Sequence, residues 1–212
     1  MEFIYLHGFA SGPSSYKSSY FCTKIESEYH WKSYSPNLNQ PDFLKLTISA
    51  QLAHLQNEFT GNSYIVMGSS LGAFVALMAA QQKTIPITAL ILLAPAFEIV
   101  ERKTKLMGDE QYRNWQKTNQ LEVFHHYHQK QMTLSFDLMR DAEKHQFKPE
   151  AITVPILLFH GKQDDVVDYR LSQKYLDNYP QVEAYYPESD HLLIDQLDLI
   201  WEKSKDFINR IS

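Results

Sequence analysis

The sequence predicts an α/β fold with about six mostly parallel strands, helices on both faces of the sheet and a helical insertion. Short apolar runs alternate with longer segments of helical periodicity over most of the 212 residues, a pattern typical of a doubly wound parallel sheet. Residues 87–93 and 154–159 are almost continuously apolar, which indicates parallel strands covered on both faces. Residues 71–80 have no polar face, which indicates a helix buried on all sides.

The expected elements follow from local patterns along the chain. Residues 2–6 form an apolar run that ends at a His-Gly pair, as a strand entering a turn does. Pro41 is expected to open a helix, because the apolar residues after it are spaced by threes and fours along one face. The full order comprises strands at 2–6, 31–35, 63–67, 87–93, 154–159 and 182–186, with helices at 16–29, from 41, at 70–82, around 171–179 and from about 191 to 211.

Residues 96–148 interrupt this alternation. They are rich in charged and aromatic residues, with helical stretches near 98–107, 109–119 and 135–145. A connection this long inside a small domain is usually a lid or a binding element. We interpret the segment as a cap inserted between two strands of a single domain that spans residues 1–212.

The composition fits one globular domain and argues against several classes of partner. The chain is 44% hydrophobic and 21% charged, with a net charge of −5 and scattered Lys and Arg, so we expect no nucleic-acid partner. No apolar run reaches the roughly 18 residues of a membrane span. The first six residues are too short for a signal-peptide core, so we expect a cytoplasmic protein. The single cysteine, Cys22, excludes an internal disulfide.

Residues 68–72 read Gly-Ser-Ser-Leu-Gly and fit the G-x-S-x-G motif. An expected strand precedes them and a buried helix follows, which is the context of a nucleophile elbow. The spacing selects Ser70 over Ser69 as the nucleophile. The alternative is an ordinary turn that opens a helix, with Ser69 or Ser70 as its N-cap.

A serine hydroxyl needs a base, and His191 is the candidate. It follows the last expected strand, and the order Ser, acid, His is the one expected on this scaffold. The acid should follow the strand that ends at residue 159, where either Asp164 or Asp165 could orient the histidine.

The backbone N–H of Leu71, next to the nucleophile, is expected to form one half of an oxyanion hole. The other half should come from the loop after the first strand, where Phe9 is the candidate. His7 in the same loop is interpreted as a structural histidine.

These motifs resemble the YqiA/YcfP-type branch of the α/β-hydrolases, which are small bacterial esterases. The resemblance rests on residues 5–13 (YLHGFASGP) with 15–17 (SYK), and on residues 68–72. The block at 160–167 (HGKQDDVV) is common to many α/β-hydrolases and places the acid on Asp164, while Asp190-His191 matches the family's histidine. Residues 96–148 are longer than in the smallest members.

The resemblance implies an α/β-hydrolase fold and a serine esterase or thioesterase that acts on a small-molecule ester or acyl thioester, without metal or organic cofactor. Competing hypotheses are peptide or C–C bond hydrolysis on the same scaffold, or a non-catalytic protein that binds a small molecule or partner. His125, His126 and His128 lie close together, but they lack the neighbouring ligands of a metal site. No sequence feature predicts an oligomeric state.

The insertion also contains a group of large apolar side chains. They form either a small core of the cap or the wall of an adaptable acyl pocket. The group comprises Met107, Met132, Met139, Trp115, Phe124, Tyr127 and Phe136.

Overall fold

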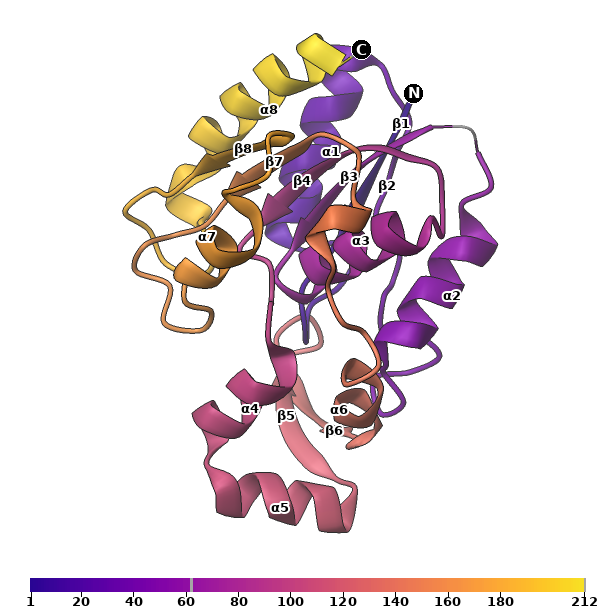
Figure 1. The fold of residues 1–212 in the computed structure, drawn as a ribbon. Coiled ribbons are helices and arrows are strands. Elements are labelled where there is room, and N and C mark those ends of the chain that lie inside the picture. The colour runs from indigo at the N-terminus through magenta and orange to yellow at the C-terminus, as the bar shows by residue number, and fades with distance from the viewer. Residues whose placement is uncertain (62, 212) are drawn as a thin grey trace.

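The computed structural model describes residues 1–61 and 63–211. Six strands form one parallel sheet, as predicted, in the order β2-β1-β3-β4-β7-β8 (Figure 1). The strands are β1 (Glu2–Leu6), β2 (Ser33–Tyr34), β3 (Tyr64–Ser69), β4 (Ile87–Leu93), β7 (Ile156–Phe159) and β8 (Val182–Tyr185).

Helices cover both faces of the sheet because successive side chains of a strand point to opposite faces. In β1, Phe3 and Tyr5 pack in one apolar cluster and Ile4 and Leu6 in the other. The first cluster includes α1 (Tyr16–Tyr29) and α8 (Leu197–Ile211); the second includes α2 (Ile48–Glu58), α3 (Leu71–Gln82) and α7 (Arg170–Leu176) (Figure 1). Helix α3 is buried along nearly its whole length, as its sequence predicts.

Two helix starts differ from the sequence-based expectation. Helix α2 begins at Ile48 instead of near Pro41, because Thr47 caps it by accepting a hydrogen bond from the backbone N–H of Ala50 at 3.1 Å. Helix α8 begins at Leu197 instead of near residue 191. The left-handed backbone of Leu193 (φ 56°) and a short 3-10 turn at Ile194–Gln196 occupy the intervening residues.

The segment between β4 and β7 lies beyond the sheet (Figure 1). It contains the expected helices, here α4 (Ile99–Met107), α5 (Asp109–Thr118) and α6 (Asp137–Ala142), with a 3-10 turn at Pro149–Ala151. It also contains an antiparallel hairpin that the sequence analysis missed, made of β5 (Leu121–His125) and β6 (Lys130–Leu134).

Several buried side chains of this segment join the core rather than forming a separate one. Trp115, Leu134, Phe136 and Met139 are almost fully buried, and they belong to the apolar cluster that includes α3. The inserted segment is therefore packed continuously with one face of the sheet.

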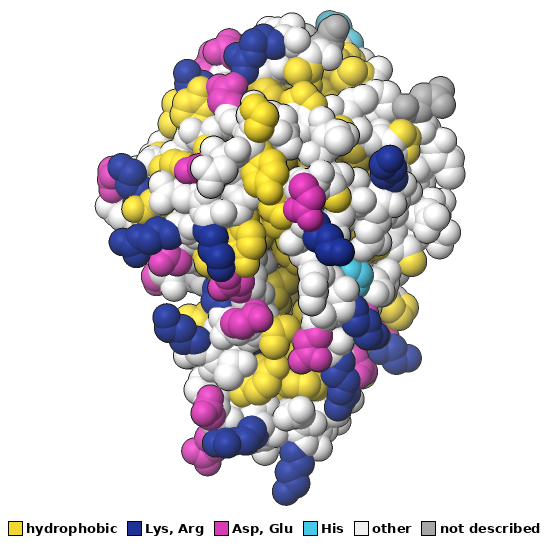
Figure 2. Space-filling view, viewed as in Figure 1, with side chains coloured by type: hydrophobic (Ala, Val, Ile, Leu, Met, Phe, Trp, Pro, Cys, Tyr) yellow, Lys and Arg dark blue, Asp and Glu magenta, His cyan; other side chains and the backbone are white. Residues whose placement is uncertain are grey.

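Charges of both signs are mixed on one face of the molecule. On the face seen in Figure 2, Lys and Arg side chains are interspersed with Asp and Glu. Among residues 1–61 and 63–211, no helix combines the length and the hydropathy that crossing a bilayer needs.

Candidate active site

Ser70 occupies the sharp turn between β3 and α3. Its backbone has φ 53° and ψ −116°, a conformation that a non-glycine residue rarely adopts. The flanking glycines make the turn possible. A Cβ at Gly68 would lie 2.6 Å from Cα of Ala73, and one at Gly72 would lie 2.5 Å from the carbonyl oxygen of His7. The turn therefore has the features of a nucleophile elbow, with Ser70 at its tip.

The structure brings Ser70, His191 and Asp164 together. Nε2 of His191 lies 3.0 Å from Oγ of Ser70, and its Nδ1 lies 2.6 Å from Oδ2 of Asp164. Asp164 follows β7 and His191 follows β8, so both loops lie at the carboxyl edge of the sheet. Gly161 lets the loops meet, because a Cβ there would lie 2.5 Å from the carbonyl oxygen of Asp190.

The carboxylate of Asp164 is fully buried and surrounded by donors. Oδ1 accepts hydrogen bonds from the backbone N–H groups of Val166 at 2.9 Å and Val167 at 2.7 Å. Burial alone would raise the pKa of Asp164, but the hydrogen bonds from His160 and His191 outweigh it and hold that pKa well below its usual range. Asp165, the other candidate acid, is exposed, so the geometry favours Asp164.

His160 is a buried neighbour of Asp164 to which the sequence analysis gave no role. Its Nε2 lies 2.9 Å from the carbonyl oxygen of Val167 and 3.0 Å from Oδ2 of Asp164. A carbonyl oxygen only accepts hydrogen bonds, so Nε2 must bear the proton. Nδ1 lies 2.7 Å from Oγ of Ser172, whose hydroxyl can donate to it. The ring therefore helps to hold the carboxylate that faces His191.

Lys17 is a second side chain beside Ser70 and His191 whose position could not be predicted from the sequence. Its Nζ donates hydrogen bonds to Oγ of Ser69 at 2.8 Å and to the carbonyl oxygen of Leu192 at 2.9 Å. Burial lowers the pKa of Lys17 to about 8. The sequence did contain one indication that Lys17 is unusual. It stands in the first turn of α1, where the positive end of the helix dipole disfavours a cation.

The loop after β1 lies directly against the elbow. A Cβ at Gly8 would lie 3.5 Å from Cβ of Ser70. The backbone N–H groups of Phe9 and Leu71 have no hydrogen-bond acceptor among the residues described, which leaves both available to a ligand oxygen. His7 donates from Nδ1 to the carbonyl oxygen of Gly8 at 2.9 Å and accepts from the N–H of Leu38 at 3.0 Å. Burial lowers the pKa of His7 to about 4, consistent with a neutral structural histidine.

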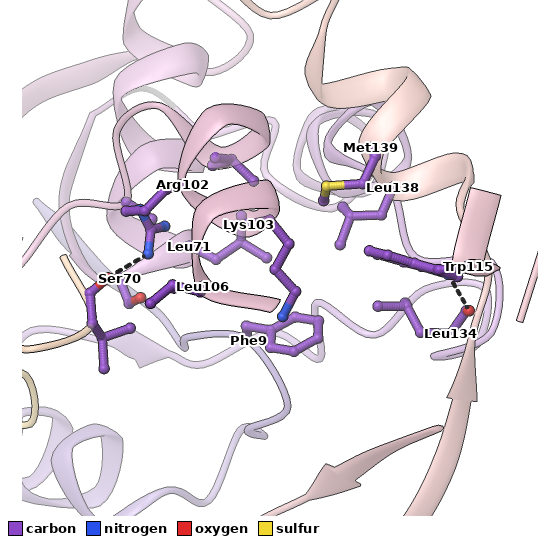
Figure 3. A pocket seen from close by; sticks show the side chains of 13 residues that line it. Phe9, Ser70, Leu71, Arg102, Lys103, Leu106, Trp115, Leu134, Leu138 and Met139 are labelled. Carbon is purple, nitrogen blue, oxygen red and sulfur yellow. Dashed lines mark hydrogen bonds between the residues drawn. The ribbon is translucent and has the colours of Figure 1, made fainter. Parts of the chain in front are cut away.

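Two cavities adjoin Ser70. The first, which we call the inner pocket, has a volume of about 130 Å³ and runs from Ser70 into the inserted segment, where Trp115 and Met139 line it (Figure 3). The second, which we call the outer pocket, has a volume of about 470 Å³ and is lined by residues that include His191 and Phe124. Large apolar residues of the insertion thus serve both as core and as pocket wall.

The histidines of the insertion stand apart from this arrangement. His125 is buried, and its Nδ1 accepts a hydrogen bond from the N–H of His128 at 3.4 Å. Within the described part of the chain, no group of three or more His, Cys, Asp or Glu is placed to hold a metal ion.

The comparison with protein families identifies the chain's relatives. The model of an uncharacterised protein family, UPF0227, matches residues 2–207. The chain belongs to the UPF0227 family. The match covers nearly the whole sequence, so the YqiA/YcfP-type resemblance seen in the motifs is confirmed. No curated protein matches the chain in a sequence search.

Solved structures show which fold this UPF0227 member shares. Alpha/beta hydrolase domain-containing protein 10 from mouse has a TM-score of 0.80 at 18% identity, over 100% of this chain and 90% of that one. Est1E from Butyrivibrio proteoclasticus, with ferulic acid bound, has a TM-score of 0.77 at 19% identity, over 100% of this chain and 89% of that one. At such identities the likeness shows the fold, which is the α/β-hydrolase fold.

Proposed function

We propose that this protein is a serine hydrolase that cleaves carboxylic esters or acyl thioesters of small molecules. The observation that carries the proposal is the continuous chain of contacts from Ser70 through His191 to Asp164, at 3.0 Å and 2.6 Å. This is the spacing at which a histidine takes a proton from a serine while a carboxylate fixes its tautomer.

In the proposed reaction, Oγ of Ser70 attacks the substrate carbonyl carbon while Nε2 of His191 takes the hydroxyl proton. The tetrahedral intermediate collapses, the bond to the leaving alcohol or thiol breaks, and His191 returns the proton to that group. Water then attacks the acyl-enzyme with His191 again as base, which releases the carboxylic acid and restores Ser70. The sum is hydrolysis, without oxidation or reduction.

The backbone N–H groups of Phe9 and Leu71 are proposed to stabilise the oxyanion of both tetrahedral intermediates. Leu71 is the first residue of α3, so its N–H points out of the helix at the positive end of the dipole. The lack of an acceptor for either amide within the described residues supports this role. Hydrogen-bond donors that already face the developing charge stabilise the transition state by a few kcal/mol each, in typical cases about 3.

The inserted segment, residues 96–148, is proposed to act as a cap that forms the substrate site within the single domain 1–212. It supplies Trp115 and Met139 to the inner pocket and Phe124 to the outer one. A mostly apolar pocket beside the nucleophile suits the acyl part of an ester better than a long peptide.

Substitution of the proposed nucleophile tests this function. Ser70→Ala should lower the turnover of 4-nitrophenyl butyrate by a thousandfold or more, on the order expected when a triad member is removed. Ser69→Ala should lower it far less. Circular dichroism and thermal unfolding would show that both variants fold. A panel of 4-nitrophenyl esters, acyl-CoA thioesters and peptides would separate the hydrolytic alternatives, and undiminished ester turnover by Ser70→Ala would refute the proposal.

A further inference from the structure

Two cationic side chains line the inner pocket, although most of its other lining residues are apolar. Arg102 and Lys103 stand on α4 and line the pocket together with Ser70 and Leu71 (Figure 3). In that view the ammonium of Lys103 reaches toward the ring of Phe9, between the end of the pocket at Ser70 and the end at Trp115. The ammonium lies 5.6 Å from the centre of that ring.

The two cations differ in what they already bind. Arg102 donates from Nε to the carbonyl oxygen of Phe97 at 3.2 Å and from Nη1 to that of Val166 at 2.7 Å, so it is anchored to the protein. Lys103 has neither an ion pair nor a hydrogen bond among the residues described. Burial, followed by the charge of Arg102, lowers the pKa of Lys103. A partly buried ammonium without a counter-ion costs free energy, which an anionic ligand would offset.

The position of His191 decides which part of a substrate meets Lys103. The histidine must return its proton to the leaving group, so the leaving group lies on the side of Nε2. His191 lines the outer pocket and not the inner one, whereas Leu71, a proposed oxyanion residue, lines only the inner one; Phe9, the other proposed oxyanion residue, lines both. The acyl group therefore enters the inner pocket and passes Lys103.

We propose that Lys103, supported by Arg102, selects acyl groups that end in a carboxylate, so that the preferred substrates are half esters or half thioesters of short dicarboxylic acids. This inference rests on the proposed function, because it assigns the acyl side from the direction of proton return. A carboxylate that reaches the ammonium would form a charge-assisted hydrogen bond in a site with little water, while the apolar walls hold the methylene chain.

Matched substrates and variants test the proposal. The 4-nitrophenyl half esters of succinic, glutaric and adipic acid are compared with neutral 4-nitrophenyl esters of the same carbon number, with uncatalysed hydrolysis subtracted. We expect the wild type to prefer the best anionic ester in kcat/KM by about tenfold or more, the range of one hydrogen bond to a charged group. Lys103→Met should abolish this preference and Lys103→Arg should keep most of it. Lys105→Met, on the exposed side of the same helix, should keep the wild-type preference and activity.

A binding measurement separates this inference from the proposed function. Calorimetric titration of adipate and of hexanoate into wild type and Lys103→Met needs no catalysis, and we expect tighter adipate binding that is lost in the variant. If adipate binding depends on Lys103 but no ester is turned over, the proposed hydrolase function is refuted and the carboxylate site at Lys103 is supported. The opposite outcome is that Ser70 turns over esters, that wild type and Lys103→Met show the same kcat/KM preference for anionic over neutral esters, and that adipate and hexanoate bind equally well. That outcome would refute the carboxylate site at Lys103 and leave the proposed hydrolase function intact.

Discussion

Lys17 donates a hydrogen bond to Oγ of Ser69, the residue that precedes Ser70, at 2.8 Å. The same ammonium donates to the carbonyl oxygen of Leu192, the residue that follows His191, at 2.9 Å. One side chain from the first helix thus joins the two loops that hold the proposed nucleophile and its base. Lys17 has the geometry of a positioning residue, since it contacts neighbours of both groups and neither group itself.

We therefore expect Lys17→Met to lower kcat more than it raises KM. The loops would lose their shared contact, and a displacement of about 1 Å between reacting groups is enough to cost a factor of about a hundred. Steady-state kinetics with a 4-nitrophenyl ester would measure the effect. Lys24→Met, on the solvent side of the same helix, is the control. A Lys17→Met enzyme with normal kcat would exclude the positioning role.

The neighbouring carboxylates Asp164 and Asp165 form a matched pair. Asp164→Asn should lower kcat on the order of a thousandfold, because an amide cannot hold the histidine in the required tautomer. Asp165→Asn should retain activity, since its side chain is exposed and outside the contacts described above. Parallel kinetic assays on the two variants would distinguish them, and similar losses in both would remove the reason for preferring Asp164.

Asp164 should also make the stability of the fold depend on pH. Although burial alone would raise its pKa, hydrogen bonds hold the pKa well below the ordinary value of 3.8. In the unfolded chain the carboxyl gains its proton near pH 4, while in the folded protein it stays charged. The unfolded state then binds more protons, so stability falls as the pH falls below about 4.

Urea unfolding of wild type and Asp164→Asn between about pH 3 and pH 7 measures this contribution. The difference in the free energy of unfolding should be constant at the upper end and shrink below about pH 4. A difference that does not change down to about pH 3 would show that the carboxylate is not stabilised by its donors.

The hydroxyl of Ser172 should contribute to stability through His160. Both side chains are fully buried and lie 2.7 Å apart. Ser172→Ala leaves Nδ1 of His160 without its donor, which should cost about 1–3 kcal/mol in the free energy of unfolding. Denaturant unfolding would measure the cost. Ser204→Ala is a useful comparison, because Oγ of Ser204 is buried and has no hydrogen-bond partner in the described part of the chain. Equal effects of the two substitutions would mean that the bond to His160 adds nothing.

The sheet was predictable from the sequence because its four central strands, β1, β3, β4 and β7, are strongly apolar, whereas several boundaries depend on local chemistry. Helix α2 begins at Ile48, seven residues after the expected start at Pro41, because Thr47 caps it. The hairpin β5–β6 was missed because its connection lacks the usual Asn-Gly or Asp-Gly signal, and Gln129 adopts the left-handed conformation instead (φ 52°).

The proposed triad followed from motif spacing and from the rule that loops after parallel strands meet at one edge. The contacts of Lys17 and Lys103 did not, because their partners are far away in the sequence, and those of His160 did not, because they depend on how the loop after β7 folds back on the histidine. The periodicity of apolar residues in the sequence predicts which helix or strand such a residue belongs to, but not which groups its side chain contacts.

Labelling with a fluorophosphonate followed by mass spectrometry would show whether His191 activates Ser70 as a nucleophile. We expect one phosphonylated residue, Ser70, with no labelling in Ser70→Ala and labelling slowed by at least about a hundredfold in His191→Ala. Labelling confined to Ser69, or labelling of Ser70 at an unchanged rate without His191, would exclude this activation.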